Sequence, residues 1–240
     1  MNFPVLEIFG PTVQGEGMVI GRKTCFVRFA ACDYQCVWCD SKFTWDGSVK
    51  PTLMNSEEIL AALIALQQDH LQHNRVDHIT ISGGNPALFK GLDQLVNLLH
   101  QAGFKVAIET QGSHWNEALL EIDEVTLSPK PPSSEMITNF PLLTEIIQQL
   151  RGRNISLKVV IFNDEDLRYA EEIYQLYPDI PLYLQVGNDQ LEDEDETATA
   201  YYLLQKYRQL VDQVMQSTTL KNVRVLPQLH ALLWGNRRGV

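Results

Sequence analysis

Three cysteines, Cys32, Cys36 and Cys39, lie close together in the sequence, in the pattern C-x3-C-x2-C. Thiolates at this spacing can surround one metal centre from a single loop. Iron–sulfur cubanes usually take four cysteine ligands, so three close ones would leave one iron open to a substrate or cofactor. Trp38, directly before the last cysteine, can exclude water from such a centre. The loop therefore favours a [4Fe–4S] cluster.

The fourth cysteine, Cys25, leaves a second interpretation of the same region. Structural zinc is usually bound by two pairs of ligands with about two to four residues inside each pair. Cys25 is separated from Cys32 by a longer gap and lies in the apolar run Thr24–Phe29. A lone cysteine in such a run is more often a small buried hydrophobic residue. A zinc-stabilised binding module is the alternative from a different class, and the spacing disfavours it.

Composition places the chain among ordinary globular proteins. Its 240 residues, 45% of them hydrophobic, suffice for one sizeable core, so we expect a single domain over residues 1–240. The net charge of −11 argues against general affinity for nucleic acid. Much of that charge lies at 189–196, which we interpret as a solvated loop. Without a long apolar run or signal peptide, we expect a cytoplasmic protein without membrane association.

Short β-branched runs alternate with longer amphipathic ones, which predicts βα units and a mostly parallel sheet or barrel. The predicted strands are Val5–Phe9, Cys25–Phe29, His78–Ile81, Lys105–Glu109, Glu124–Leu127, Leu157–Phe162, Leu182–Gln185 and Asn222–Leu226. The predicted helices are Ser56–Gln72, Leu88–Ala102, Glu117–Ile122, Phe140–Arg151, Asp164–Leu176 and Glu196–Met215. We expect Ser56 to cap the helix that begins at this residue, and Asn163 to cap the helix that begins at Asp164.

Polar segments follow several of the predicted strands. In parallel α/β folds the loops at the carboxyl ends of the strands share one rim, and that rim holds the active site. Segments that are distant in sequence would therefore converge in space. They are the cysteine loop and residues 82–84, 109–112, 128–130 and 185–188.

The cysteine loop resembles the signature of the radical S-adenosylmethionine (SAM) superfamily, C-x3-C-x-aromatic-C. Ser82-Gly83-Gly84-Asn85-Pro86 resembles that superfamily's glycine-rich SAM-binding strand end, where glycine permits close backbone approach to a ligand. The resemblance implies SAM bound to the open iron and cleaved to a 5′-deoxyadenosyl radical. It also implies an α/β fold, a single-domain partial (β/α) barrel of about six core strands whose open side the C-terminal helical region covers.

One residue departs from the superfamily's pattern. An acid usually follows the two glycines and contacts the amino group of SAM, whereas this chain has Asn85. Its amide oxygen accepts a hydrogen bond, but without the assistance of a charge. The sequence therefore does not assign the group that binds the SAM amino group.

More of the sequence resembles one subfamily, the 7-carboxy-7-deazaguanine synthases. The supporting segments run from near the N-terminus to the C-terminal tail. The resemblance implies ring contraction of 6-carboxy-5,6,7,8-tetrahydropterin with loss of ammonia, on the route to queuosine and related 7-deazapurines. The segments are 14–17, Arg28, 39–41, 109–112, 128–130 and 227–230.

The resemblance also implies roles for individual residues. Arg28 would bind the substrate carboxylate, as guanidinium groups do in bidentate pairs, although an ordinary salt bridge is the alternative. Glu16 would accept from the amino edge of the pterin, and His230 would line its pocket. Catalytic roles are predicted for Arg28, Glu16 and His230. Substrate contacts are predicted for Val13, Gln14, Gly15, Arg28, Ser82 and Val240.

A second set of residues would hold the cofactors. Ser41 supplies the hard oxygen that Mg²⁺ prefers. Asp40 beside it would orient the site or bind a water on the metal, with an ordinary loop-turn role as the alternative. Glu109 would bind the SAM ribose, with an ion pair to Lys130 as the alternative. Cluster ligands are Cys32, Cys36 and Cys39. Cofactor contacts are predicted for Val37, Trp38, Cys39, Gly83, Gly84, Asn85, Glu109, Ser128, Pro129 and Lys130.

Another radical SAM activity, such as installing a glycyl radical on a protein partner, fits the cysteine loop equally well. Residues 14–17 and Arg28 favour a small carboxylated substrate instead. The resemblance further implies a flavodoxin- or ferredoxin-type electron donor and a homodimer.

Overall fold

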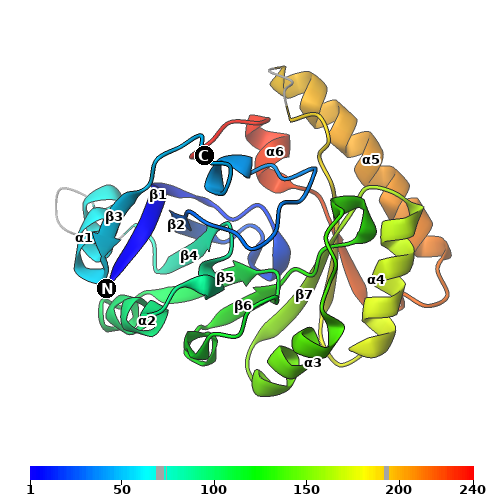
Figure 1. Ribbon diagram of the computed structural model, residues 1–240. Helices are drawn as coiled ribbons and strands as arrows, with labels where there is room; N and C mark the ends of the chain where they lie inside the picture. The colour runs from blue at the N-terminus through cyan, green and yellow to red at the C-terminus, as the bar shows by residue number, and fades with distance from the viewer. Residues whose placement is uncertain (69–72, 74, 192–194) are drawn as a thin grey trace.

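The computed structural model describes residues 1–68, 73, 75–191 and 195–240. The fold is α/β, as predicted. One nine-stranded sheet curves into a partial barrel, with its strands in the order β3-β1-β2-β4-β5-β6-β7-β8-β9 and the main helices along its outer side (Figure 1).

Within the described residues the strands from β2 to β9, apart from β3, are parallel, whereas β1 and β3 are antiparallel to their neighbours. The parallel core is thus one strand larger than the six that we expected. The strands are β1 (Asn2–Val13), β2 (Lys23–Phe29), β3 (Thr52–Asn55), β4 (His78–Gly83), β5 (Lys105–Thr110), β6 (Glu124–Leu127), β7 (Ile155–Ile161), β8 (Leu182–Val186) and β9 (Val223–Leu226).

The helices largely follow the predicted pattern. Residues 117–120 form a short 3-10 helix, η4, rather than the predicted helix to Ile122, and α2 begins later than expected because η3 (Pro86–Leu88) precedes it. The α-helices are α1 (Ser56–Gln67), α2 (Leu92–Gln101), α3 (Phe140–Gln149), α4 (Asp164–Leu176), α5 (Glu196–Gln216) and α6 (Leu229–Trp234).

Two predicted helix starts show how capping selects the boundary. The cap of α1 is Asn55, one residue before the predicted Ser56, because Asn55 and Glu58 form a reciprocal capping box. Asn163 caps α4 as predicted, its side chain accepting from the backbone N–H groups of Glu165 and Asp166. The end predicted for the first helix, Gln72, lies outside the described residues.

Alternation along the parallel strands separates the core from the barrel interior. In β7, Leu157, Val159 and Ile161 belong to the hydrophobic core that packs under the outer helices. Lys158 and Val160 lie between them and line a cavity on the opposite face. Every residue of β7 is buried, which is expected for a strand that is covered on both sides.

The barrel interior is partly filled by the segment that follows β1. Because β1 is antiparallel to β2, its last residue, Val13, pairs with Lys23 at the beginning of β2. The chain then turns inward through η1 (Gly17–Val19), which contacts β6, β7 and β8. Figure 1 shows this N-terminal segment in dark blue within the curve of the sheet. Residues 14–16 of this segment line the cavity, and we call the segment 14–19 the floor segment.

The C-terminal region closes the side left open between the first and last strands. Helix α5 packs against β8, β9 and α6. The tail that follows α6 then reaches β1, where Arg238 Nε donates to Glu7 Oε1 at 2.9 Å. Figure 1 places the C-terminus above β1, across the opening of the barrel.

Candidate functional site

One cavity joins the carboxyl ends of the parallel strands to the segment after β1 and to the C-terminal tail. Of the predicted site residues, Asn85, Val37, Ser128 and Pro129 do not line its wall. Those that do are Val13, Gln14, Gly15, Glu16, Arg28, Cys32, Cys36, Trp38, Cys39, Ser41, Ser82, Gly83, Gly84, Glu109, Lys130, His230 and Val240.

The three clustered cysteines face this cavity as free thiols. Burial raises the pKa of all three, and that of Cys36 to about 11, while the positive charge of Lys130 opposes the shift. Binding iron would convert these thiols to thiolates. By contrast, Cys25 is fully buried in β2, within the hydrophobic core, as its apolar surroundings in the sequence predicted.

Side chains from other loops hold the cysteine loop in place. Trp38 Nε1 donates to Ser133 Oγ at 3.0 Å, and its ring lies 4.8 Å from that of Phe162. Gln111 Nε2 lies 3.2 Å from Cys32 Sγ and 2.7 Å from Asp33 Oδ1. These contacts fix the loop from two sides, which leaves the thiols directed at one space.

The two glycines after β4 allow the chain to pass directly behind the cysteine loop. A Cβ at Gly84 would lie 2.1 Å from the carbonyl oxygen of Ala31 and 2.8 Å from Cβ of Cys32. At Gly83, with φ +134°, a Cβ would lie 2.1 Å from the carbonyl oxygen of Phe29. Only glycine fits at either position, so the residue pair sets the distance between the β4 strand end and the cysteines.

Asn85, the departure from the superfamily's pattern, is fully buried and bonded within the protein. Its Oδ1 accepts from Thr110 Oγ1 at 2.7 Å and from the N–H of Ala87. Its Nδ2 donates to Asp33 Oδ1 at 2.9 Å and to Ser113 Oγ. The amide therefore ties β4 and β5 to the cysteine loop.

A buried lysine that sequence reasoning missed lines the cavity. The side chain of Lys158 is only 2% exposed, and its Nζ lies 2.5 Å from both Glu16 Oε2 and Glu109 Oε1. The alternative pairing of Glu109 with Lys130 is wrong, since Lys130 Nζ donates instead to Ser128 Oγ at 3.1 Å. A lysine within the apolar strand sequence 155–161 was the available signal, because buried lysines are almost always paired.

Glu16 is held by partners on both of its oxygens. Burial alone would raise its pKa, but the charges of Lys158 and His230 and the hydrogen bonds from Lys158 and Gln228 lower it well below its ordinary value. Gln228 Nε2 donates to Glu16 Oε1 at 3.0 Å. Glu16 is thus an ionised, acceptor-only group at neutral pH.

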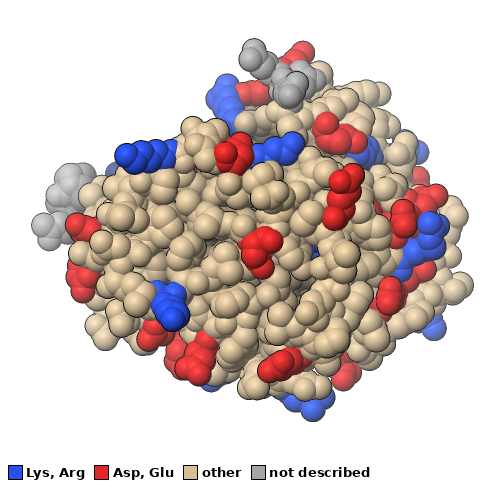
Figure 2. Space-filling model, in the orientation of Figure 1, with Lys and Arg blue, Asp and Glu red and all other residues tan. Residues whose placement is uncertain are grey.

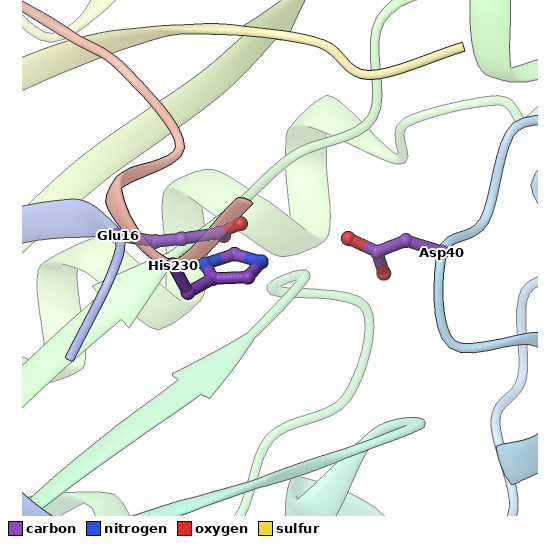
Figure 3. A group of neighbouring side chains, drawn as sticks. All are labelled: Glu16, Asp40 and His230. Atoms are coloured by element: carbon purple, nitrogen blue, oxygen red, sulfur yellow. The ribbon is translucent and has the colours of Figure 1, made fainter. Parts of the chain in front are cut away.

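Glu16, Asp40 and His230 come from three separate segments and point toward one another (Figure 3). One ligand atom from each lies within 4.8 Å of the other two. Gly15 explains the approach of His230, since a Cβ at this position would lie 2.3 Å from the imidazole Nδ1. The three side chains frame a space suited to the polar edge of a small molecule or to a cation.

Arg28 forms the salt bridge that was the alternative, and it also lines the cavity, so binding of a substrate carboxylate stays a prediction. Its Nε lies 3.5 Å from Glu7 Oε2, and its guanidinium lies over the rings of Phe9 and Phe43 at 5.3 and 5.4 Å. Burial lowers its pKa, and the charges of Glu7 and Asp40 oppose that shift. Because arginine stays protonated in proteins, the cavity holds a fixed positive charge here.

Two hydroxyls and one amide complete the polar lining. Ser41 Oγ donates to Asp40 Oδ1 at 3.0 Å, so these two oxygens already lie side by side. In the described part of the chain, Ser82 Oγ and Gln228 Oε1 are buried without a hydrogen-bond partner. Both residues line the cavity, and buried polar atoms without partners are rare. They indicate where a ligand would supply the missing bonds.

The outer surface does not resemble a nucleic-acid interface on the face shown in Figure 2. Acidic side chains there are scattered among isolated basic ones, and the described residues on this face form no continuous basic patch. No described helix is long and apolar enough to cross a membrane.

Comparison with known proteins agrees with this geometry. Residues 26–176 match the radical SAM superfamily. The chain is 53% identical over 241 residues to a 7-carboxy-7-deazaguanine synthase of Bacillus cereus, covering 100% of this chain and 99% of that protein. It is 55% identical over 245 residues to the protein of the same name from Bacillus subtilis, with the same coverage.

The fold also has a counterpart among solved structures. The crystal structure of QueE from Escherichia coli matches with a TM-score of 0.68 at 24% identity, covering 95% of each chain. At that identity the match concerns the fold, which is the predicted partial barrel.

Proposed function

The chain belongs to the radical SAM superfamily and, within it, to the 7-carboxy-7-deazaguanine synthase family, and we propose here how its residues serve that reaction. The reaction contracts 6-carboxy-5,6,7,8-tetrahydropterin to 7-carboxy-7-deazaguanine with loss of ammonia. The observation that carries this function is the 53–55% identity to two synthases along the full chain. Queuosine or a related 7-deazapurine is the proposed end of the pathway.

The residues present fit the two cofactors of the superfamily. Three free thiols from one loop face one cavity, the donor set that a [4Fe–4S] cluster with an open iron requires. When bound, the reduced cluster and SAM supply the radical that abstracts a substrate hydrogen. Gly83 and Gly84 let the end of β4 lie directly against the backbone at Phe29 and Ala31, and both line the cavity where we place SAM.

We assign further SAM contacts to residues around these glycines. Glu109 accepts from the ribose hydroxyls, and Lys130, with Ser128 and Pro129 behind it, faces the carboxylate. Trp38 and the backbone at Val37 and Cys39 cover the adenosine side. Asn85 acts indirectly, because its four hydrogen bonds inside the protein position Asp33 and Thr110.

The substrate is held on the opposite side of the cavity. Ionised Glu16 accepts N–H bonds from the aminopyrimidine edge, a specificity that a protonated carboxyl would lose. Arg28 binds the 6-carboxylate, and His230 closes the pocket beside Glu16 and Gly15. The unpaired hydroxyl of Ser82 points to a further hydrogen bond. Val13, Gln14 and Val240 complete the lining.

Mg²⁺ is proposed beside the substrate carboxylate. Ser41 and Asp40 present two hard oxygens at one point of the cavity wall. Ser41 Oγ could bind the ion through a lone pair while its O–H continues to donate to Asp40 Oδ1. Calorimetry of the holoprotein and its Ser41→Ala variant with MgCl₂ and substrate tests this assignment.

We also propose a cytoplasmic homodimer that receives electrons from a flavodoxin- or ferredoxin-type donor. These assignments follow from family membership. Sedimentation of the purified holoprotein tests the dimer, and reduction of the cluster by each donor class tests the electron source.

The test of the reaction is anaerobic. The protein is reconstituted with iron and sulfide, reduced with dithionite and supplied with SAM, Mg²⁺ and 6-carboxy-5,6,7,8-tetrahydropterin, and products are followed by liquid chromatography–mass spectrometry. Formation of 7-carboxy-7-deazaguanine with many turnovers per SAM supports the proposal. Formation of 5′-deoxyadenosine alone would retain the superfamily and point to another substrate, such as the protein target of a glycyl-radical activase.

A further inference from the structure

Lys158 contacts two carboxylates that come from opposite sides of the cavity. Glu16 belongs to the segment after β1, and Glu109 lies near the end of β5. The lysine reaches both from β7, with its Nζ 2.5 Å from one oxygen of each. The charge of His230 also acts on Glu16, but within the described residues Lys158 alone lies at ion-pair distance from either acid.

Without the lysine, the carboxylates of Glu16 and Glu109 would repel each other. Two carboxylate oxygens that each lie 2.5 Å from the same nitrogen are at most about 5 Å apart, a distance at which like charges repel strongly in a buried site. Burial favours the neutral form of the lysine, but both acids raise its pKa. The three groups together therefore carry one net negative charge around one shared ammonium.

We propose that Lys158 is a positioning residue that couples the substrate subsite to the SAM subsite by sharing one positive charge between Glu16 and Glu109. This inference rests on the proposed function, in which Glu16 binds the pterin and Glu109 the SAM ribose. It adds that each acid's strength as a hydrogen-bond acceptor depends on the other.

The direction of the coupling follows from the geometry. If one acid is made neutral, Lys158 loses an ionic partner and pairs more tightly with the remaining carboxylate. That carboxylate then has less negative charge to offer its ligand. Glu109→Gln should therefore weaken binding of the substrate, although Glu109 is assigned to SAM. By the same reasoning, Glu16→Gln should weaken binding of SAM.

The experiment measures both dissociation constants on the reconstituted holoprotein under anaerobic, unreduced conditions, so that no turnover occurs. Equilibrium dialysis gives the values for SAM alone and for 6-carboxy-5,6,7,8-tetrahydropterin alone. Each substitution should raise the dissociation constant of its own ligand and also raise that of the other ligand by about fivefold or more. Arg28→Lys is the matched control, because Arg28 faces the substrate without contacting Lys158; it should affect substrate binding only.

Lys158→Met then removes the shared charge. In that background Glu109→Gln should no longer weaken substrate binding beyond about twofold, the limit for independent sites. If the methionine variant does not fold, the crossed effects of the two glutamine variants still decide the question. If each glutamine variant weakens binding of its own ligand but not of the other ligand, the coupling role of Lys158 is wrong and the assignments of Glu16 and Glu109 stand. If Glu16→Gln leaves substrate binding unchanged, the assigned role of Glu16 and the coupling both fail.

Discussion

Gly84→Ala should remove the cluster while leaving the protein folded. The added Cβ would lie 2.1 Å from Ala31 O, 2.5 Å from Ala31 C and 2.8 Å from Cβ of Cys32. Ordinary van der Waals contact begins at 3.4 Å. The β4 strand end and the cysteine loop must therefore separate by about 1 Å or more. Of the three predicted cluster ligands, Cys32 would be displaced first, because it directly follows Ala31 and its own Cβ is in the clash.

The expected magnitudes differ for stability and for activity. Overpacking of a closely packed contact typically costs about 1–3 kcal/mol of folding free energy. For a chain of this size that corresponds to about 2–4 °C in melting temperature per kcal/mol. A displacement of about 1 Å in a catalytic constellation can lower the rate by about 100-fold. Activity should thus fall far more than stability.

The assay is the iron and sulfide content per chain after anaerobic reconstitution, measured without SAM. This separates a displaced cysteine loop from a lost SAM contact. Gly103→Ala is the matched control, because its φ of +87° strains any side chain while nothing lies within 4 Å of its Cβ. It should lower the melting temperature yet bind a full cluster. A Gly84→Ala variant with full iron content and normal cleavage of SAM would refute the steric argument.

Three further predictions concern the cysteines, a helix cap and pH. Replacing Cys32, Cys36 or Cys39 by alanine should abolish formation of 5′-deoxyadenosine, whereas Cys25→Ala should retain it, because Cys25 lies in the core; loss of cleavage in the Cys25 variant would contradict the ligand assignment. Asn163→Ala should cost about 1 kcal/mol in urea unfolding with normal turnover, since Asn163 Oδ1 caps α4 by accepting from Glu165 and Asp166. The folded-state pKa of Glu16 lies below its ordinary value of 4.5, so its contribution to stability is present above that pH and is lost as the pH falls further. Glu16→Gln should therefore lose less stability than the native chain on acidification below about pH 4.5, and equal slopes in urea unfolding would disprove this.

The sequence predicted the parallel sheet well because its buried strands are continuous β-branched runs between helical patterns. Glu124–Leu127 in β6 and Asp164–Leu176 in α4 have the predicted bounds. Strand β3 was missed because it is short, lies at the sheet edge and has no apolar alternation. Helix α6 was missed for a related reason, since six residues are too few to display a helical period.

Site residues could be predicted from the sequence where the type of residue alone indicates its chemistry. They could not be predicted where the chemistry depends on which partners the residue meets in the fold. Cysteines at close spacing and paired glycines can be recognised in the sequence alone. The environment of Lys158 cannot, because it is set by ion pairs with Glu16 and Glu109, which are distant in sequence. The erroneous pairing of Glu109 with Lys130 has the same origin: proximity along the chain was the only available guide to which cation an acid would meet.

Contacts between the two ends of the chain complete this site. Gln228 bonds Glu16 across a separation of 212 residues, and Arg238 bonds Glu7 across 231. The N–H of Leu229 donates to the carbonyl of Gly15, which sets the floor segment against α6. Each contact closes a very long loop, whose entropy must be offset by the packing of the intervening sheet. The residues to which we assign substrate binding are therefore held in place jointly by the sheet and by both ends of the chain.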